Sequence, residues 1–152
     1  MPKVMIAYYS AGGTTQKMAD YIGEGVRISG GEAVVKEIVD IKTAEELVGY
    51  DDYILGAPTY SLDVPAAMKK FLSLAQKAGL AGKLGGAFGS YTHDVSYRHD
   101  THAPAIILDT LQDSYKMQPF ELGPLILQED IMDTAEGMRA CQDYGKVFGE
   151  KL

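Results

Sequence analysis

A short apolar segment that turns directly into a helix is the feature that most constrains how this chain folds. Residues 4–8 are apolar throughout, which is typical of a strand buried on both faces of a sheet. A helical pattern follows, with the apolar residues Met18, Ala19, Ile22 and Val26 on one stripe. The connection between strand and helix is short. This strand–turn–helix unit predicts an α/β fold in which the helix starts at the carboxyl end of a buried strand.

The turn itself has the composition of an anion-binding loop. The first N–H groups of the helix have no intrahelical acceptor, and the helix dipole favours a negative charge there. Glycines allow close approach of a ligand to the backbone, and hydroxyls add donors. An ordinary N-cap followed by a Gly-Gly turn would explain the same residues. The candidate phosphate-binding residues are Ser10, Ala11, Gly12, Gly13, Thr14 and Thr15.

The rest of the chain continues the alternation of strand and helix. Further strands are expected at residues 33–39, 51–57, 84–89 and 120–127, and helices at 43–48, 65–79, from 104 onward, and at 132–148. In the helix at 43–48, Thr43 would be the N-cap and Glu46 would complete a capping box. The pattern predicts a doubly wound, five-stranded parallel sheet with helices on both faces. Ligands bind beyond the carboxyl ends of such strands. The irregular stretches 10–15, 58–63 and 90–102 follow three strands and would open at one sheet edge.

Length and charge limit the classes of function. With 152 residues the chain is expected to be one domain, 1–152. The net charge of −7 argues against nucleic-acid binding and favours partners with a basic surface. The sequence contains no apolar run of about 18 residues, so no membrane span is predicted, and the N-terminus lacks a secretory signal pattern. The single cysteine, Cys141, is expected to be buried in the last helix and fits a reducing cytoplasm.

Three motifs in this order resemble the flavodoxin family. Ser10-x-x-Gly13-x-Thr15 is similar to the family's phosphate loop. Residues 56–60 (Gly-Ala-Pro-Thr-Tyr) resemble its second loop, which holds an aromatic ring against the flavin. Residues 88–91 (Phe-Gly-Ser-Tyr) resemble the start of its third loop. The resemblance spans the whole chain and implies an FMN cofactor and the strand order 2-1-3-4-5.

The resemblance also implies the residues around the flavin ring. The family often places Trp where this chain, which has no Trp, has Tyr60. Either Tyr91 or Tyr97 would cover the outer ring face. The implied contacts outside the phosphate loop are Pro58, Thr59, Tyr60, Ser90, Tyr91, Thr92, Asp94 and Tyr97. Neither the ATP-binding pattern G-x-x-x-x-G-K-[S/T] nor the dinucleotide pattern G-x-G-x-x-G is present.

All three histidines fall in the third irregular stretch, at His93, His99 and His102. Their spacing matches no strong metal motif, so a solvated polar loop is the favoured interpretation. Contacts to flavin or substrate come second and a metal site third. Asp63 in the second irregular stretch and Asp94 in the third would lie near a bound flavin. Their negative charges would make reduction of the flavin harder, or they are plain surface carboxylates.

The leading hypothesis is an FMN-binding protein that carries electrons between redox partners, as a monomer or dimer. An FMN-dependent NAD(P)H:quinone-type oxidoreductase is the enzyme alternative, so whether the chain is an enzyme stays open. Kinship with the flavodoxin module of diiron flavoproteins is a related possibility, although no H-x-x-E diiron ligand pattern is present. A flavin-free interaction module is a further alternative. A receiver domain is disfavoured because strand three ends in Gly56-Ala57-Pro58 instead of Asp.

Overall fold

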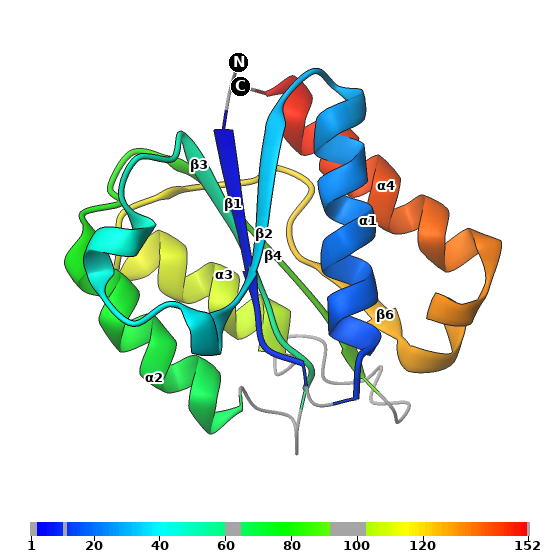
Figure 1. The fold of residues 1–152 in the computed structure, drawn as a ribbon, viewed down its shortest axis with the longest axis horizontal. Coiled ribbons are helices and arrows are strands. Elements are labelled where there is room, and N and C mark those ends of the chain that lie inside the picture. The colour runs from blue at the N-terminus through cyan, green and yellow to red at the C-terminus, as the bar shows by residue number, and fades with distance from the viewer. Residues whose placement is uncertain (1–2, 11, 60–64, 92–102, 152) are drawn as a thin grey trace.

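The computed structural model describes residues 3–10, 12–59, 65–91 and 103–151 as three layers, with a parallel sheet between two pairs of helices. Figure 1 shows α1 and α4 on one face of the sheet and α2 and α3 on the other. The strands are β1 (Lys3–Tyr8), β2 (Glu32–Glu37), β3 (Asp52–Gly56), β4 (Leu84–Tyr91), β5 (Gln118–Pro119) and β6 (Leu125–Gln128). The α-helices are α1 (Thr14–Ile28), α2 (Ala66–Ala75), α3 (Ala103–Asp113) and α4 (Ala135–Glu150). Short 3-10 helices are η1 (Ile38–Asp40), η2 (Ala44–Leu47), η3 (Gln76–Ala78) and η5 (Glu129–Asp133).

The strand order β2-β1-β3-β4-β5 confirms the predicted sheet topology. β1 pairs in parallel with β2 and with β3, and its side chains alternate between two cores. Val4 and Ile6 belong to the core under α1 and α4, whereas Met5 and Ala7 belong to the core under α2 and α3. All four are fully buried. This is the strand buried on both faces that the apolar run predicts.

The edge of the sheet beside β4 differs from the prediction. Instead of one strand over residues 120–127, β5 pairs with the start of β4 and β6 pairs with its end. The Phe120 N–H still donates to the Gly85 carbonyl at 2.8 Å, and residues 121–124 then leave the ladder, where Pro124 has no N–H to donate and Gly123 has a φ of 72°. The sheet therefore has six strand segments, two of which share one edge position.

The Tyr144 hydroxyl completes the ladder where β5 and β6 are interrupted. The backbone N–H of Ala87 in β4 donates to this hydroxyl at 3.2 Å, and the hydroxyl donates to the Gly123 carbonyl at 2.8 Å. Tyr144 is 4% exposed, and burial raises the pKa of its phenol, which stays protonated and able to donate. One side chain from α4 thus satisfies two backbone groups of the interrupted edge.

Several element boundaries also differ from the sequence prediction. β2 ends at Glu37, because Ile38 and Ile41 turn inward to pack in the core below α2. β4 continues to Tyr91 because β6 supplies hydrogen-bonding partners for its last residues. α4 begins at Ala135 instead of near residue 132, because the Thr134 side chain caps it by accepting from the backbone N–H of Gly137 at 3.2 Å.

Other sequence predictions are confirmed. The short helix near residue 45 is the 3-10 helix η2, with the predicted capping box of Thr43 and Glu46. The predicted stripe of α1 is buried throughout. Cys141 is fully buried, and burial raises the pKa of its thiol to about 12. None of the helices in the described ranges has the length and apolarity that crossing a membrane requires.

We expect Tyr144→Phe to lower the free energy of unfolding by roughly 1–3 kcal/mol, because it leaves the Ala87 N–H and the Gly123 carbonyl unsatisfied. Urea denaturation followed by circular dichroism measures this loss. Tyr21→Phe is the matched control, since Tyr21 is half-buried in α1 and its hydroxyl bonds to none of the described residues. Equal stability of the Tyr144 variant and the wild type would contradict the bridging role.

Candidate functional site

The described parts of the three predicted loops meet at one edge of the sheet, beyond the carboxyl ends of β1, β3 and β4. The Tyr9 N–H donates to the Gly56 carbonyl at 3.0 Å, which joins the first loop to the end of β3. The Thr59 N–H donates to the Ser90 carbonyl at 2.9 Å, which joins the second loop to the end of β4. The ladder bonds thus continue past the strands and hold the loop bases together, as the sequence predicts.

The first loop leaves its helix donors open. Gly13 is the N-cap of α1 with a φ of 91°, a conformation that favours glycine. Its N–H donates to the Ser10 Oγ at 2.9 Å, so the Ser10 side chain braces the turn and caps none of the helix N–H groups. The first intrahelical bond is donated by Lys17. The N–H groups of residues 14–16 have no acceptor among the described residues, which favours the cradle over the ordinary cap.

Thr15 supplies a second indication of a ligand. Its side chain is 1% exposed, yet its hydroxyl forms no hydrogen bond with any residue that the structure describes. A buried hydroxyl without a partner costs stability unless something else satisfies it. A phosphate oxygen beside the N-terminus of α1 would accept from this hydroxyl and from the open N–H groups. The donor set of this loop therefore fits the phosphate group of FMN.

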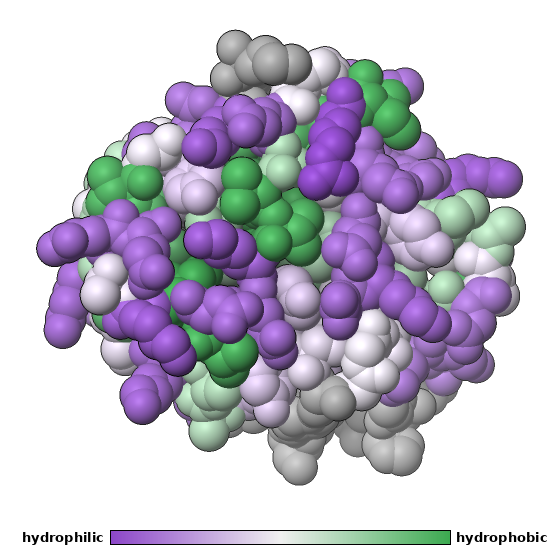
Figure 2. Space-filling view, in the orientation of Figure 1, coloured by the Kyte–Doolittle hydropathy of each residue, from purple (hydrophilic) through white to green (hydrophobic). Residues whose placement is uncertain are grey.

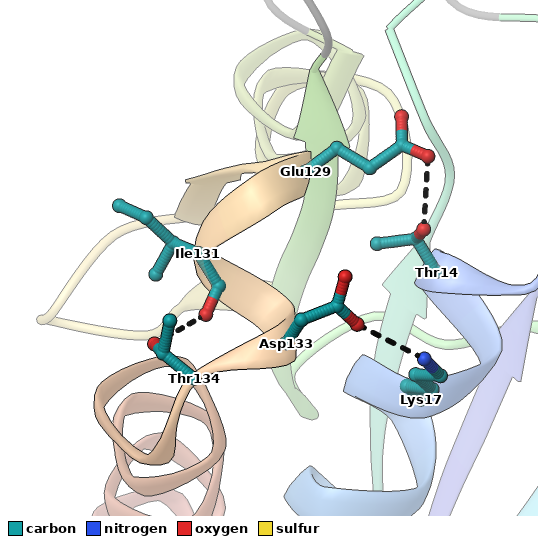
Figure 3. Close-up of polar contacts among 6 residues, drawn as sticks. All are labelled: Thr14, Lys17, Glu129, Ile131, Asp133 and Thr134. Atoms are coloured by element: carbon teal, nitrogen blue, oxygen red, sulfur yellow. Dashed lines mark hydrogen bonds and ion pairs between the residues drawn. The ribbon is translucent and has the colours of Figure 1, made fainter.

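Carboxylates from η5 lie against the same loop (Figure 3). The Thr14 hydroxyl donates to Glu129 Oε1 at 3.1 Å, and Lys17 Nζ lies 3.2 Å from Asp133 Oδ1. A hollow of about 530 Å³ opens between the loop and η5. Its lining residues are Gly12, Thr14, Lys17, Gln128, Glu129, Asp130 and Asp133. Lys17 thus already has a carboxylate partner, and the other donors that the described residues of this loop offer an anion are neutral.

The end of β1 also lies in a negative environment. Burial raises the pKa of Tyr8, and the carboxylates of Glu37, Asp20 and Asp40 raise it further. The phenol therefore stays protonated at neutral pH. An anion bound beside the start of α1 would be held mainly by the helix dipole and hydrogen bonds.

The second and third loops place their described residues in different roles. Pro58 and Thr59 are half-buried, and Thr59 Oγ1 accepts from the first N–H of α3, on Ala103, at 2.9 Å. Ser90 is 3% exposed and Tyr91 is half-buried, and both belong to β4 instead of the predicted loop. Their contacts to a flavin stay predictions. The predicted site residues outside the described part are Ala11, Tyr60, Asp63, Thr92, His93, Asp94, Tyr97, His99 and His102.

The η5 carboxylates are site residues that the sequence interpretation missed. The topology could have indicated them, because the segment that follows the last parallel strand must emerge at the same edge of the sheet as the other loops. Its acidic composition gives no hint of a phosphate neighbour. Within the described ranges, no group of three His, Cys, Asp or Glu side chains is arranged to hold a metal ion.

Comparisons with known proteins agree with this geometry. A family model described as a flavodoxin domain matches residues 5–123. The chain is 34% identical over 113 residues to a protein of Sinorhizobium fredii and 30% identical over 126 residues to one of Rhizobium johnstonii, both named NAD(P)H dehydrogenase (quinone). These alignments cover 59% and 70% of this chain but 57% and 64% of those proteins. The chain thus spans about three-fifths of the length of these curated relatives.

Solved structures match over the full length of the chain. Oxidised flavodoxins 1 and 2 of Bacillus cereus superpose with TM-scores of 0.81 and 0.84 at 27% and 26% identity, with 99% of each chain covered. A flavodiiron protein from Giardia intestinalis superposes with a TM-score of 0.82 at 21% identity, over 98% of this chain and 36% of its own. This last likeness shows a shared fold, in agreement with the predicted similarity to the flavodoxin module of diiron flavoproteins.

We expect Thr15→Val to weaken binding of FMN roughly 10- to 100-fold and binding of riboflavin less than about twofold, because only FMN has a phosphate to accept from the hydroxyl. Fluorescence quenching titrations measure both constants. The free energy of unfolding without FMN should stay equal or rise, since an unpaired buried hydroxyl is removed. Thr110→Val on α3 is the matched control, because the Thr110 hydroxyl donates to the Ile106 carbonyl away from the site. Equal losses for the two flavins would remove Thr15 from the phosphate site.

We expect Glu129→Gln to strengthen FMN binding roughly tenfold at low salt, because it removes a negative charge beside the phosphate while the amide still accepts from Thr14. The gain should shrink at high salt and be absent for riboflavin. Glu32→Gln is the control, since Glu32 begins β2 at the opposite edge of the sheet. Unchanged FMN affinity at low salt would show that Glu129 does not face the bound phosphate.

Proposed function

Because the chain belongs to the flavodoxin family and its cofactor is FMN, we propose that it carries electrons between redox proteins. The bound flavin supplies the electron chemistry, since its ring system accepts and releases electrons. The protein supplies binding, orientation and the electrostatic environment. A cytoplasmic location, expected from the single cysteine, is part of the proposal.

The residues of the first loop would hold the phosphate end of FMN. Gly13 turns the chain so that the N–H groups of residues 14–16 converge, and Ser10 fixes that turn. The hydroxyls of Thr14 and Thr15 add donors, the first of which is held by Glu129 in the structure. A monophosphate suits this site, because a longer phosphate chain would meet the η5 carboxylates, and the one lysine that lines this hollow, Lys17, already faces Asp133.

Full-length correspondence with small flavodoxins is the observation that carries the choice of electron carrier. The chain covers 99% of each of the two Bacillus cereus flavodoxins, so every part of those proteins has a counterpart here. The formal charge of −7 supports encounters with partners that present a basic surface. These redox partners are part of the proposal.

An FMN-dependent NAD(P)H:quinone oxidoreductase is the second candidate. The names of the curated relatives from Sinorhizobium fredii and Rhizobium johnstonii favour it. The alignments with these relatives cover 57% and 64% of their length.

Anaerobic reduction of the FMN-loaded protein separates the two candidates. We expect NADH or NADPH alone to leave the visible flavin absorption unchanged over minutes, and a catalytic amount of a flavodoxin reductase with NADPH to bleach it. A stopped-flow or diode-array spectrophotometer records both reactions, and free FMN at the same concentration is the control.

Each other outcome has a definite meaning. Rapid bleaching by NADH or NADPH alone, followed by recovery of the colour on adding a quinone, would overturn the carrier in favour of the oxidoreductase. An FMN titration without fluorescence quenching would show that the chain is a flavin-free interaction module.

A further inference from the structure

A second hollow, of about 600 Å³, lies between α2 and the segment that follows β2, outside the phosphate site. Figure 2 shows hydrophobic surface bordered by hydrophilic side chains in this region of the face that Figure 1 presents. We call this hollow the α2 groove. Its lining residues are Ile38, Val39, Ile41, Lys42, Ala67, Lys70, Phe71, Ser73, Leu74 and Lys77.

The floor of the α2 groove is apolar and belongs to the core. Ile38, Ile41 and Phe71 form it and are each no more than 5% exposed. At the rim, Val39 is 49% exposed, although it is a large apolar side chain. Apolar surface thus continues from the floor to the outside. Such a surface gains free energy when a partner covers it.

Three lysines surround this apolar floor. Lys70 lies on α2, Lys77 lies on η3 directly after it, and Lys42 stands on the opposite wall. All three are exposed, and none forms an ion pair with another residue that the structure describes. The chain as a whole carries a formal charge of −7, so this local positive charge is opposite in sign to the rest of the surface. It selects a negatively charged occupant.

We propose that the α2 groove docks an acidic amphipathic segment of a partner protein. The segment would place two or three apolar side chains on the floor and carboxylates beside the lysines. Lys70 on α2 and Lys77 on η3 are seven residues, or about two helical turns, apart along these consecutive helices. Carboxylates at i and i+7 of a partner helix have the same spacing, which is the geometry of a helix bound in a groove.

The shape of the groove favours a protein segment over a small amphipathic anion. Binding sites for small ligands enclose most of the ligand surface. Here the apolar surface extends outward to Val39 and ends in open solvent, so a small molecule would stay largely exposed. A partner protein can cover the floor and the rim together.

The α2 groove lies beside the edge of the sheet that carries the phosphate loop. η1 directly follows the carboxyl end of β2, and β2 pairs with β1 along its whole length. A partner held in the groove would therefore sit next to the loops at the end of β1. Docking itself does not depend on the proposed electron carriage, because the groove contains none of the phosphate-site residues.

Selection from a phage library of random peptides of about twelve residues tests the proposal on the folded, FMN-saturated protein. We expect the enriched peptides to combine two or more Asp or Glu residues with two or three apolar ones. Fluorescence anisotropy of a synthetic peptide from this pool then measures the dissociation constant. The double variant Lys70→Glu/Lys77→Glu should weaken binding at least tenfold, whereas Lys146→Glu on α4 should change it less than twofold.

Four results would overturn the proposal. The first two are the absence of any enriched peptide and an enriched pool without an excess of acidic residues. The third is equal peptide binding by the charge-reversed variant and the wild type. The fourth is a bound peptide that shifts NMR signals of residues elsewhere on the protein and leaves those of Val39 and Phe71 unchanged. Decanoate that shifts the Val39 and Phe71 signals while no peptide binds would assign the groove to a small amphipathic anion instead. FMN quenching measured on the same samples reports the flavin site separately, so failure of docking and failure of the proposed function are distinguishable.

Discussion

The pairing of β1 on both sides is the constraint on which the rest of the structure depends. Tyr8, the last residue of β1, is in register with Glu37 of β2 and Gly56 of β3. Because the strands are parallel, the turn after β1 must open beside the turn after β3. Burial on both faces also fixes the alternation of the two cores. The position of the phosphate loop therefore follows from the packing of six residues in the middle of the sheet.

Charge is distributed unevenly over the molecule, and this distribution links the site to the groove. The phosphate cradle combines neutral donors with surrounding carboxylates, and its nearest lysine, Lys17, already faces Asp133. Affinity for an anion must then come from the helix terminus and from well-placed hydrogen bonds. The α2 groove shows the reverse arrangement, with lysines around an apolar floor. A partner with a basic surface would therefore approach the phosphate cradle, and a partner with an acidic segment would approach the α2 groove.

Sequence patterns anticipate the elements that depend on local periodicity and capping. The stripe of α1 and the capping box of Thr43 and Glu46 are confirmed, and so is the strand order that the resemblance to the flavodoxin family implies. The interrupted edge beside β4 could not be derived in the same way. Its stability depends on the Tyr144 hydroxyl, which reaches β4 from α4 and lies 57 residues from Ala87 along the chain. No local pattern records a contact of that kind.

By itself the sequence determined the α/β class, the candidate phosphate loop, and the edge at which three loops meet, because hydrophobic period and turn chemistry are local properties. Tertiary structure alone decided what surrounds that loop. The opening strand, turn and helix predict a cradle or a cap, and only the folded chain leaves the buried Thr15 hydroxyl without a partner among the described residues and brings Glu129 to Thr14. These outcomes depend on contacts between segments that are distant in the sequence. The residue pattern of one segment does not give the geometry of such a contact.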